Sequence, residues 1–145
     1  AVPDLMKGVA NRVPYALNAL AEACLLMDDL EEAKRTALAC IEWNECHGNQ
    51  DQLIWALRVW ARISASLRDP AAARSALRRS CLLARMHRMR PHTAWNLIAW
   101  GDLLVCSGKP GKARACYRRS LALWSEMGNR HQADRVRTLL HRLQA

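Results

Sequence analysis

The chain has 145 residues, of which 51% are hydrophobic, and this is enough to bury the core of one domain. It contains no run of 18 apolar residues, which excludes a membrane-spanning helix, and no signal-peptide pattern. We expect a cytoplasmic protein that has no membrane partner. The net charge of +9 is uneven: residues 1–51 hold 4 Lys and Arg against 9 Asp and Glu, whereas residues 52–145 hold 18 against 4. This uneven distribution of charge predicts an acidic partner for the C-terminal part, or charge matching with adjoining protein.

Residues 1–13 are predicted to be the tail of a truncated preceding repeat and a linker. Gly8 lies forty residues before Gly48, which is placed as a helix-ending glycine. The first residue is Ala rather than Met, so we expect the chain to be a piece of a longer protein.

From residue 14 onward the chain repeats itself every forty residues. Leu17, Leu57 and Leu97 stand in register. Other columns hold aromatic, bulky or small residues: Tyr15, Trp55 and Trp95; Leu20, Trp60, Trp100 and Leu140; Ala21, Ala61 and Gly101; Ala33, Ala73 and Ala113. A fixed period in this range indicates a stacked array of helical units. The predicted repeats cover residues 14–51, 52–91 and 92–129, and a capping helix follows at 130–143.

Each repeat has the apolar spacing of two helices. In the first, Leu17, Leu20, Ala21 and Cys24 are offset by i, i+3, i+4 and i+7, which is one face of a helix. Breaks at 28–29, 68–70 and 107–110 precede second helices at 30–46, 70–88 and 110–127. No alternating run of β-branched residues indicates a strand. We therefore predict an all-α fold of seven helices, made of three antiparallel pairs and a C-terminal cap.

The third repeat reads Leu97-x-x-Trp100-Gly101-x-x-Leu104 and then Ala113-x-x-x-Tyr117. This pattern resembles the tetratricopeptide repeat, although the period is forty residues rather than the usual 34. Repeats of this length that end in Gly-Asn are similar to those in the sensor domains of MalT-type bacterial transcription regulators of the LuxR family. The resemblance implies an α-solenoid with a right-handed superhelix.

In tetratricopeptide arrays the first helices line a concave groove that binds a peptide or protein segment. The resemblance maps this partner-binding groove to Tyr15, Asn18, Glu22, Trp55, Arg58, Arg62, Trp95 and Asp102. Arg58 and Arg62 lie one turn apart and suit a carboxylate. We therefore expect a non-catalytic interaction or ligand-sensing module of a larger signal-responsive transcription regulator, whose partner is a protein, a peptide or another domain of the same polypeptide.

Two alternatives stay open. The charged column of Glu22, Arg62 and Asp102 could form ion pairs between neighbouring helices, and the aromatic column could pack against the preceding second helix. The chain could also be a stand-alone adaptor, or a basic solenoid that contacts nucleic acid through a convex arginine ladder. That ladder consists of Lys34, Arg74, Arg78, Arg79, Arg114, Arg118 and Arg119. No nucleic-acid-reading motif accompanies it, so nucleic acid is the less favoured partner.

The sequence carries no pattern of an enzyme or of a metal site. No Ser/His/Asp set and no glycine-rich phosphate loop occurs. The six cysteines include no Cys-x-x-Cys pair and no Cys/His cluster at zinc spacing. We expect six reduced cysteines, no catalytic residue, no metal and no other cofactor.

Overall fold

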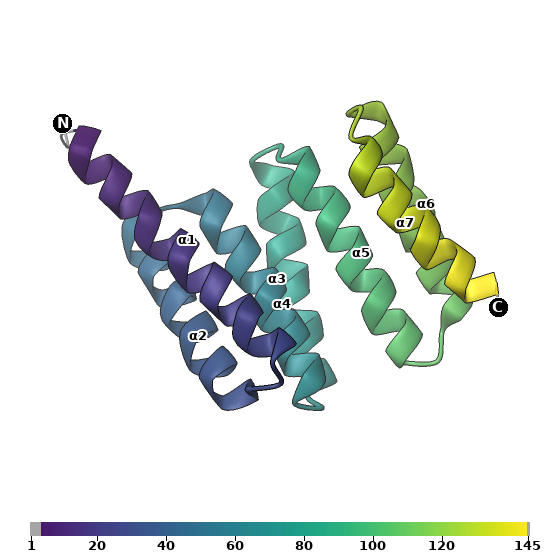
Figure 1. Cartoon of the computed structure of the whole chain (residues 1–145), viewed down its shortest axis with the longest axis horizontal. Helices are drawn as coiled ribbons and strands as arrows, with labels where there is room; N and C mark the ends of the chain where they lie inside the picture. The colour runs from purple at the N-terminus through teal and green to yellow at the C-terminus, as the bar shows by residue number, and fades with distance from the viewer. Residues whose placement is uncertain (1–3, 145) are drawn as a thin grey trace. The chain divides into compact units, whose positions relative to one another are not determined.

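The computed structural model describes the backbone of residues 4–144 and the side chains of residues 12–144. This part of the chain contains seven α-helices and no strand, which confirms the all-α prediction. The helices are α1 (Asp4–Leu26), α2 (Leu30–His47), α3 (Gln50–Ser66), α4 (Pro70–Met86), α5 (Arg90–Cys106), α6 (Pro110–Glu126) and α7 (Arg130–Gln144) (Figure 1). No helix among the described residues is both long and apolar enough to cross a membrane.

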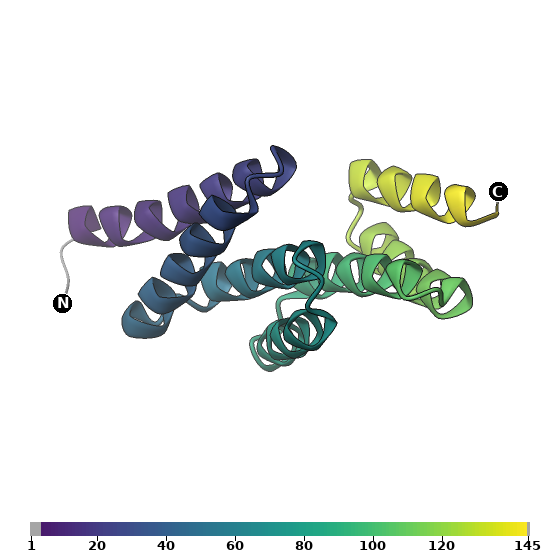
Figure 2. The same cartoon turned by 90° about the horizontal axis from the view of Figure 1, so that it is seen from below.

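Consecutive helices are joined by short turns, and within residues 4–83 and within residues 90–144 each helix runs back along the one before it (Figures 1 and 2). The turns fall at the predicted breaks because a residue with positive φ recurs every twenty residues. These residues are Asp28, Gly48, Arg68, Arg88, Gly108 and Gly128, with φ between 53° and 73°. After the left-handed residue, the next N–H reaches back to close the helix end, as in the 2.9 Å bond from Asp29 N to Cys24 O.

The start of α1 differs from the expected linker over 1–13. The helix begins at Asp4 and continues through Gly8 and Pro14, and residues 1–3 lie outside the described part of the chain. A glycine inside a helix costs only about 1 kcal/mol, so Gly8 by itself need not end one. Pro14 is buried inside the helix, and its carbonyl oxygen accepts a bond from Cys40.

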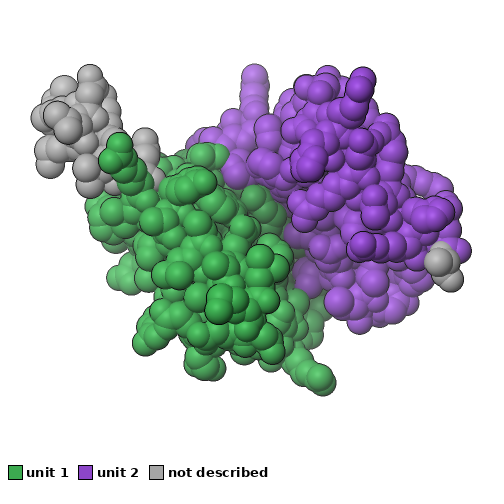
Figure 3. Space-filling model, in the orientation of Figure 1, with its two compact units in different colours: residues 1–83 green, residues 84–145 purple. Residues whose placement is uncertain are grey.

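The chain forms two compact units, residues 1–83 and residues 84–145 (Figure 3). In the first unit, α1 packs on both α2 and α3, and α2 packs on α3. Its core contains Ala21, Cys24, Ala33, Ala37, Val59 and Ile63. In the second unit, α6 packs between α5 and α7. Its core contains Ala94, Ile98, Ala113, Tyr117, Trp124, Ala133 and Val136.

One interhelical hydrogen bond is repeated in all three helix pairs. Cys40 Sγ lies 3.4 Å from the carbonyl oxygen of Pro14, and Ser80 Oγ and Ser120 Oγ lie 2.8 Å from the carbonyl oxygens of Ile54 and Ala94. The donor follows its acceptor by 26 residues in each case. Burial raises the pKa of Cys40 to about 11, so the thiol stays protonated at neutral pH and its S–H group donates the hydrogen bond. Each bond ties the second helix of a pair to the first.

Gly101 on α5 lies directly against the ring of Tyr117 on α6. A Cβ atom added at Gly101 would lie 2.3 Å from Tyr117 Cε1. In the second repeat the same two columns hold Ala61 and Leu77, both buried. The larger aromatic ring on α6 therefore requires the smaller residue on α5.

We expect Gly101→Ala to destabilise the protein by about 1–3 kcal/mol, because the methyl group overlaps the Tyr117 ring. Gly111→Ala is the matched control. Its Cβ would meet no atom within 4 Å, so the substitution should be neutral or slightly stabilising. Urea unfolding of the two variants measures the difference. Equal free energies of unfolding would contradict the assigned contact.

Cys40→Ser should preserve or raise stability, because serine holds the equivalent position in the other two pairs. Ser80→Ala should instead cost about 1–2 kcal/mol, since it removes a buried donor. Thermal unfolding measures the stability of both variants, and Ser75→Ala on the exposed side of α4 serves as the control. A Ser80→Ala variant as stable as the parent would show that the bond contributes nothing.

Candidate functional site

In the first unit, four of the predicted groove residues meet around one carboxylate, and we call them the Glu22 cluster: Tyr15, Glu22, Trp55 and Arg62. Trp55 Nε1 donates to Glu22 Oε1 at 3.0 Å, and Arg62 Nη1 lies 3.5 Å from the same oxygen. The ring of Tyr15 meets that of Trp55 edge-on, with centroids 5.5 Å apart and an interplanar angle of 68°. The cluster joins α1 to α3 while leaving Tyr15 59% exposed.

Arg58 adds a second guanidinium one turn before Arg62. Burial lowers the pKa of Arg58 to about 10, while the Glu22 carboxylate acts in the opposite direction. Arg58 is therefore still charged at neutral pH. The α3 side thus carries Arg58 and Arg62, and the carboxylates of Glu22 and Asp51 both favour the charged form of Arg58.

Next to the cluster lies an open hollow of about 630 Å³. It is lined by Arg12, Tyr15, Asn49, Asp51 and Gln52. Asn49 also caps α3, because its Oδ1 accepts from Gln52 N at 3.2 Å. The hollow therefore lies at the N-terminal end of α3 and shares Tyr15 with the Glu22 cluster. Apart from Tyr15, none of its lining residues was predicted, because the sequence pattern placed residues 49–52 at a junction between repeats.

Asn18 was predicted to face the groove, and the structure corrects this. Its side chain is fully buried, and Nδ2 donates to both the backbone oxygen and Oε1 of Gln52, each at 3.1 Å. These two bonds satisfy Nδ2, whereas Oδ1 is buried without a hydrogen-bond partner among the described residues, so only part of the cost of burying the amide is offset. Asn18 holds α1 against the start of α3 and offers nothing to a partner.

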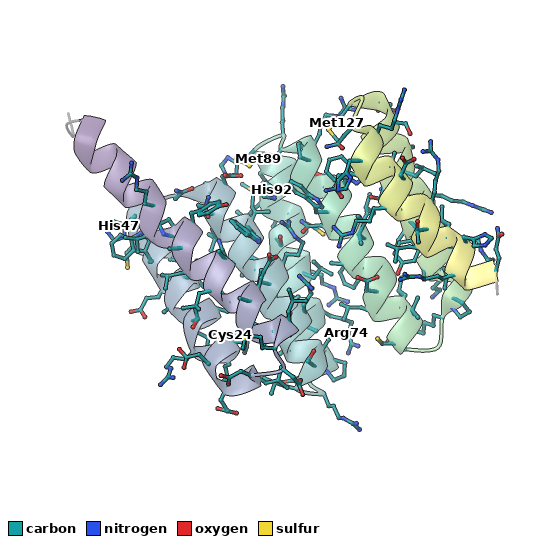
Figure 4. The ribbon with its side chains drawn as sticks, viewed as in Figure 1. Cys24, His47, Arg74, Met89, His92 and Met127 are labelled. Carbon is teal, nitrogen blue, oxygen red and sulfur yellow. The ribbon has the colours of Figure 1, made fainter. Side chains whose placement is uncertain are left out.

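The groove residues predicted in the third repeat are held within the second unit. The half-buried ring of Trp95 packs edge-on against His92 and Trp124, with centroids 5.6 and 5.1 Å away. Asp102 Oδ1 accepts a hydrogen bond from the hydroxyl group of Tyr117, with the two oxygens 2.5 Å apart. Burial and this carboxylate raise the pKa of Tyr117. Trp95 therefore packs against the core of its own unit, through the following helix α6 rather than the preceding second helix that the sequence had left open. His92, buried near the start of α5, was not predicted (Figure 4).

The arginine ladder lies mostly on exposed surface. Lys34, Arg74, Arg78, Arg79, Arg118 and Arg119 are exposed, and Arg114 is half-buried. Arg74 lies in the second turn of α4 (Figure 4). Arg79 Nη1 makes an ion pair with Glu45 Oε1 at 2.7 Å, which partly neutralises the ladder. All six cysteines are free thiols, and the described residues contain no group of three His, Cys, Asp or Glu placed to hold a metal ion.

No protein-family model matches the chain, and comparison with curated proteins gives no significant match.

Asn18→Ala should cost about 1–3 kcal/mol, because it removes two interhelical hydrogen bonds from a buried site. Arg62→Ala should change stability by less than about 1 kcal/mol, because both partners of its ion pair are more than a third exposed. Chemical unfolding of the two variants measures this contrast. A large loss in Arg62→Ala would mean that the Glu22 cluster serves the fold rather than binding.

Proposed function

We propose that the chain is a non-catalytic, tetratricopeptide-like module that binds a protein or peptide segment along the α1–α3 side of its first unit. The Glu22 cluster is the observation that carries this proposal. Together with the adjacent Arg58, the cluster provides an exposed aromatic ring, a desolvated arginine and a partly exposed arginine on two packed helices. Rigid aromatic and arginine side chains of this kind supply most of the binding energy in many interfaces.

The arrangement indicates what the segment contains. Tyr15 offers a flat apolar surface beside the hollow, which suits an aromatic or aliphatic side chain. Arg62 holds Glu22 only at 3.5 Å, so an acidic group of the ligand can bind its guanidinium while Trp55 keeps Glu22 in place. The hollow adds the charged side chains of Arg12 and Asp51 to its lining. We therefore propose a segment with an apolar anchor followed by an acidic residue.

The wider assignment rests on the sequence resemblance. We propose that the helix pairs form a right-handed tetratricopeptide-like superhelix, and that the module serves a larger signal-responsive regulator similar to the MalT type. The packing of α1 on both α2 and α3 supports the tetratricopeptide-like stacking, but carries no information on handedness, since each first helix of such an array contacts its own partner and the next first helix. The arginine ladder serves, in this proposal, as a solvated outer surface.

The proposal is tested with peptides selected from a random display library against the purified protein. Selected peptides should share an apolar residue near an Asp or Glu, and fluorescence anisotropy gives their affinities. Tyr15→Ala and Arg62→Ala should each weaken binding by about 1–2 kcal/mol, as expected for anchor residues. The control is the double variant Arg78→Ala/Arg118→Ala, which should bind almost as the parent does at physiological salt.

The opposite pattern of variant effects would contradict the proposal. If the ladder variant loses the peptides and both cluster variants keep them, the convex basic surface is the binding site. Binding that falls steeply with added salt in all variants would likewise indicate a nonspecific polyanion site.

A further inference from the structure

The side chain of Gln52 connects the buried contact between α1 and α3 to the open hollow. Its backbone oxygen and its Oε1 both accept hydrogen bonds from Nδ2 of Asn18, each at 3.1 Å. Asn18 is fully buried, whereas Gln52 is half-buried and lines the hollow together with Tyr15. One side-chain amide of the proposed binding surface is therefore held by a residue of the interior.

The orientation of the Asn18 amide follows from the backbone oxygen of Gln52. A carbonyl oxygen only accepts hydrogen bonds, so the Asn18 atom that lies 3.1 Å from it must be the donor Nδ2. Turning the amide over would put Oδ1 of Asn18 against this oxygen, and two acceptors at that distance repel each other. The amide of Asn18 is therefore fixed, even though its Oδ1 has no hydrogen-bond partner among the described residues.

The orientation of the Gln52 amide follows in turn. Nδ2 of Asn18 has a second hydrogen, which points to the side chain of Gln52. The atom that meets this donor must be the acceptor Oε1. Nε2 of Gln52 is then the group turned away from Asn18, and it donates no hydrogen bond to any residue whose side chain the structure describes.

We infer that Nε2 of Gln52 donates a hydrogen bond to a carbonyl oxygen of the bound segment, beside the apolar anchor that contacts Tyr15. This inference rests on the proposed function and assigns a specificity-determining residue to that site. Asn18 acts through Gln52 as a positioning residue. Its buried amide holds Oε1, so that the hollow presents a hydrogen-bond donor rather than an acceptor.

A fixed amide discriminates between ligand groups, whereas a free amide does not. A glutamine on open surface turns its amide over and so donates or accepts as the ligand requires. Turning over the amide of Gln52 would break the bond at Oε1 and set Nε2 against Nδ2 of Asn18, and both of these groups are donors. An N–H group of a ligand at this point would meet Nε2 and stay unpaired, which costs binding free energy.

Gln52→Glu tests the orientation without any ligand. Glutamate keeps an oxygen at the position of Oε1, so Asn18 still donates to it, and only the Nε2 group is replaced. The melting temperature should stay close to that of Gln50→Glu, which makes the same chemical change on α3 at a residue outside the lining of the hollow. If Nε2 instead faced Asn18, the new carboxylate would meet Oδ1 of Asn18. A much lower melting temperature of Gln52→Glu than of Gln50→Glu would therefore overturn the inference.

Fluorescence anisotropy with a peptide selected from the display library tests the donor. Gln52→Glu should raise the dissociation constant about tenfold, because two oxygens would then face each other, whereas Gln50→Glu should change it little. Alanine replacement along the peptide distinguishes the two sources of the carbonyl oxygen. A side-chain oxygen predicts one peptide position whose replacement removes the effect of Gln52→Glu, and a backbone oxygen predicts no such position.

The outcomes separate this inference from the proposed function. Peptide binding that depends on Tyr15 and Arg62 but is unchanged by Gln52→Glu would contradict the role of Gln52 and leave the binding site intact. Equal losses in Gln52→Glu and Gln50→Glu would indicate a general effect of negative charge, and would also contradict that role. A library that yields no specific peptide would contradict the proposed function and the role of Gln52 with it.

Discussion

The hydrogen bond from the second helix to a carbonyl of the first sets the geometry on which the rest of each pair depends. Its donors at 40, 80 and 120 are short side chains, so the bond forms only when the two helices lie close together. Such closeness requires small residues nearby, and Ala33, Ala73 and Ala113 are all completely buried. It also accounts for the size match between Gly101 and Tyr117. Pair geometry is thus specified by polar and steric constraints together, and hydrophobic burial supplies the driving force.

The same geometry prepares the candidate site. Because α1 and α3 are each held by their own second helices, the side chains between them stand on rigid elements rather than on loops. Asn18 adds a direct bond between α1 and the start of α3. Glu22 and Trp55 then meet at a fixed distance one turn further along α1. On α1, Asn18 therefore holds the fold, whereas Glu22, one turn later, belongs to the proposed binding site.

Much of this arrangement follows from the forty-residue register. The register predicts the helix breaks, and it aligns Tyr15 with Trp55 and Glu22 with Arg62, two pairs that do lie in contact. The register treats all residues of one column as equivalent, however, whereas the residues that surround them differ from repeat to repeat. Trp95 packs into its unit because Trp124 stands where earlier repeats have Asn44 and Ala84. Asn18 was misplaced for a related reason: a polar side chain gives no sign of burial when its partner lies 34 residues away.

The left-handed turn residues have a consequence for local opening of the helices. Glycine adopts this conformation without steric cost, whereas an arginine pays roughly 1 kcal/mol for its Cβ. Helix α4 lies between Arg68 and Arg88, so both of its ends adjoin a strained turn, while α6 lies between Gly108 and Gly128. The terminal amides of α4 should therefore exchange with solvent sooner than those of α6, although both helices have 17 residues. The equal lengths of α4 and α6 thus conceal unequal lifetimes of the hydrogen bonds at their ends.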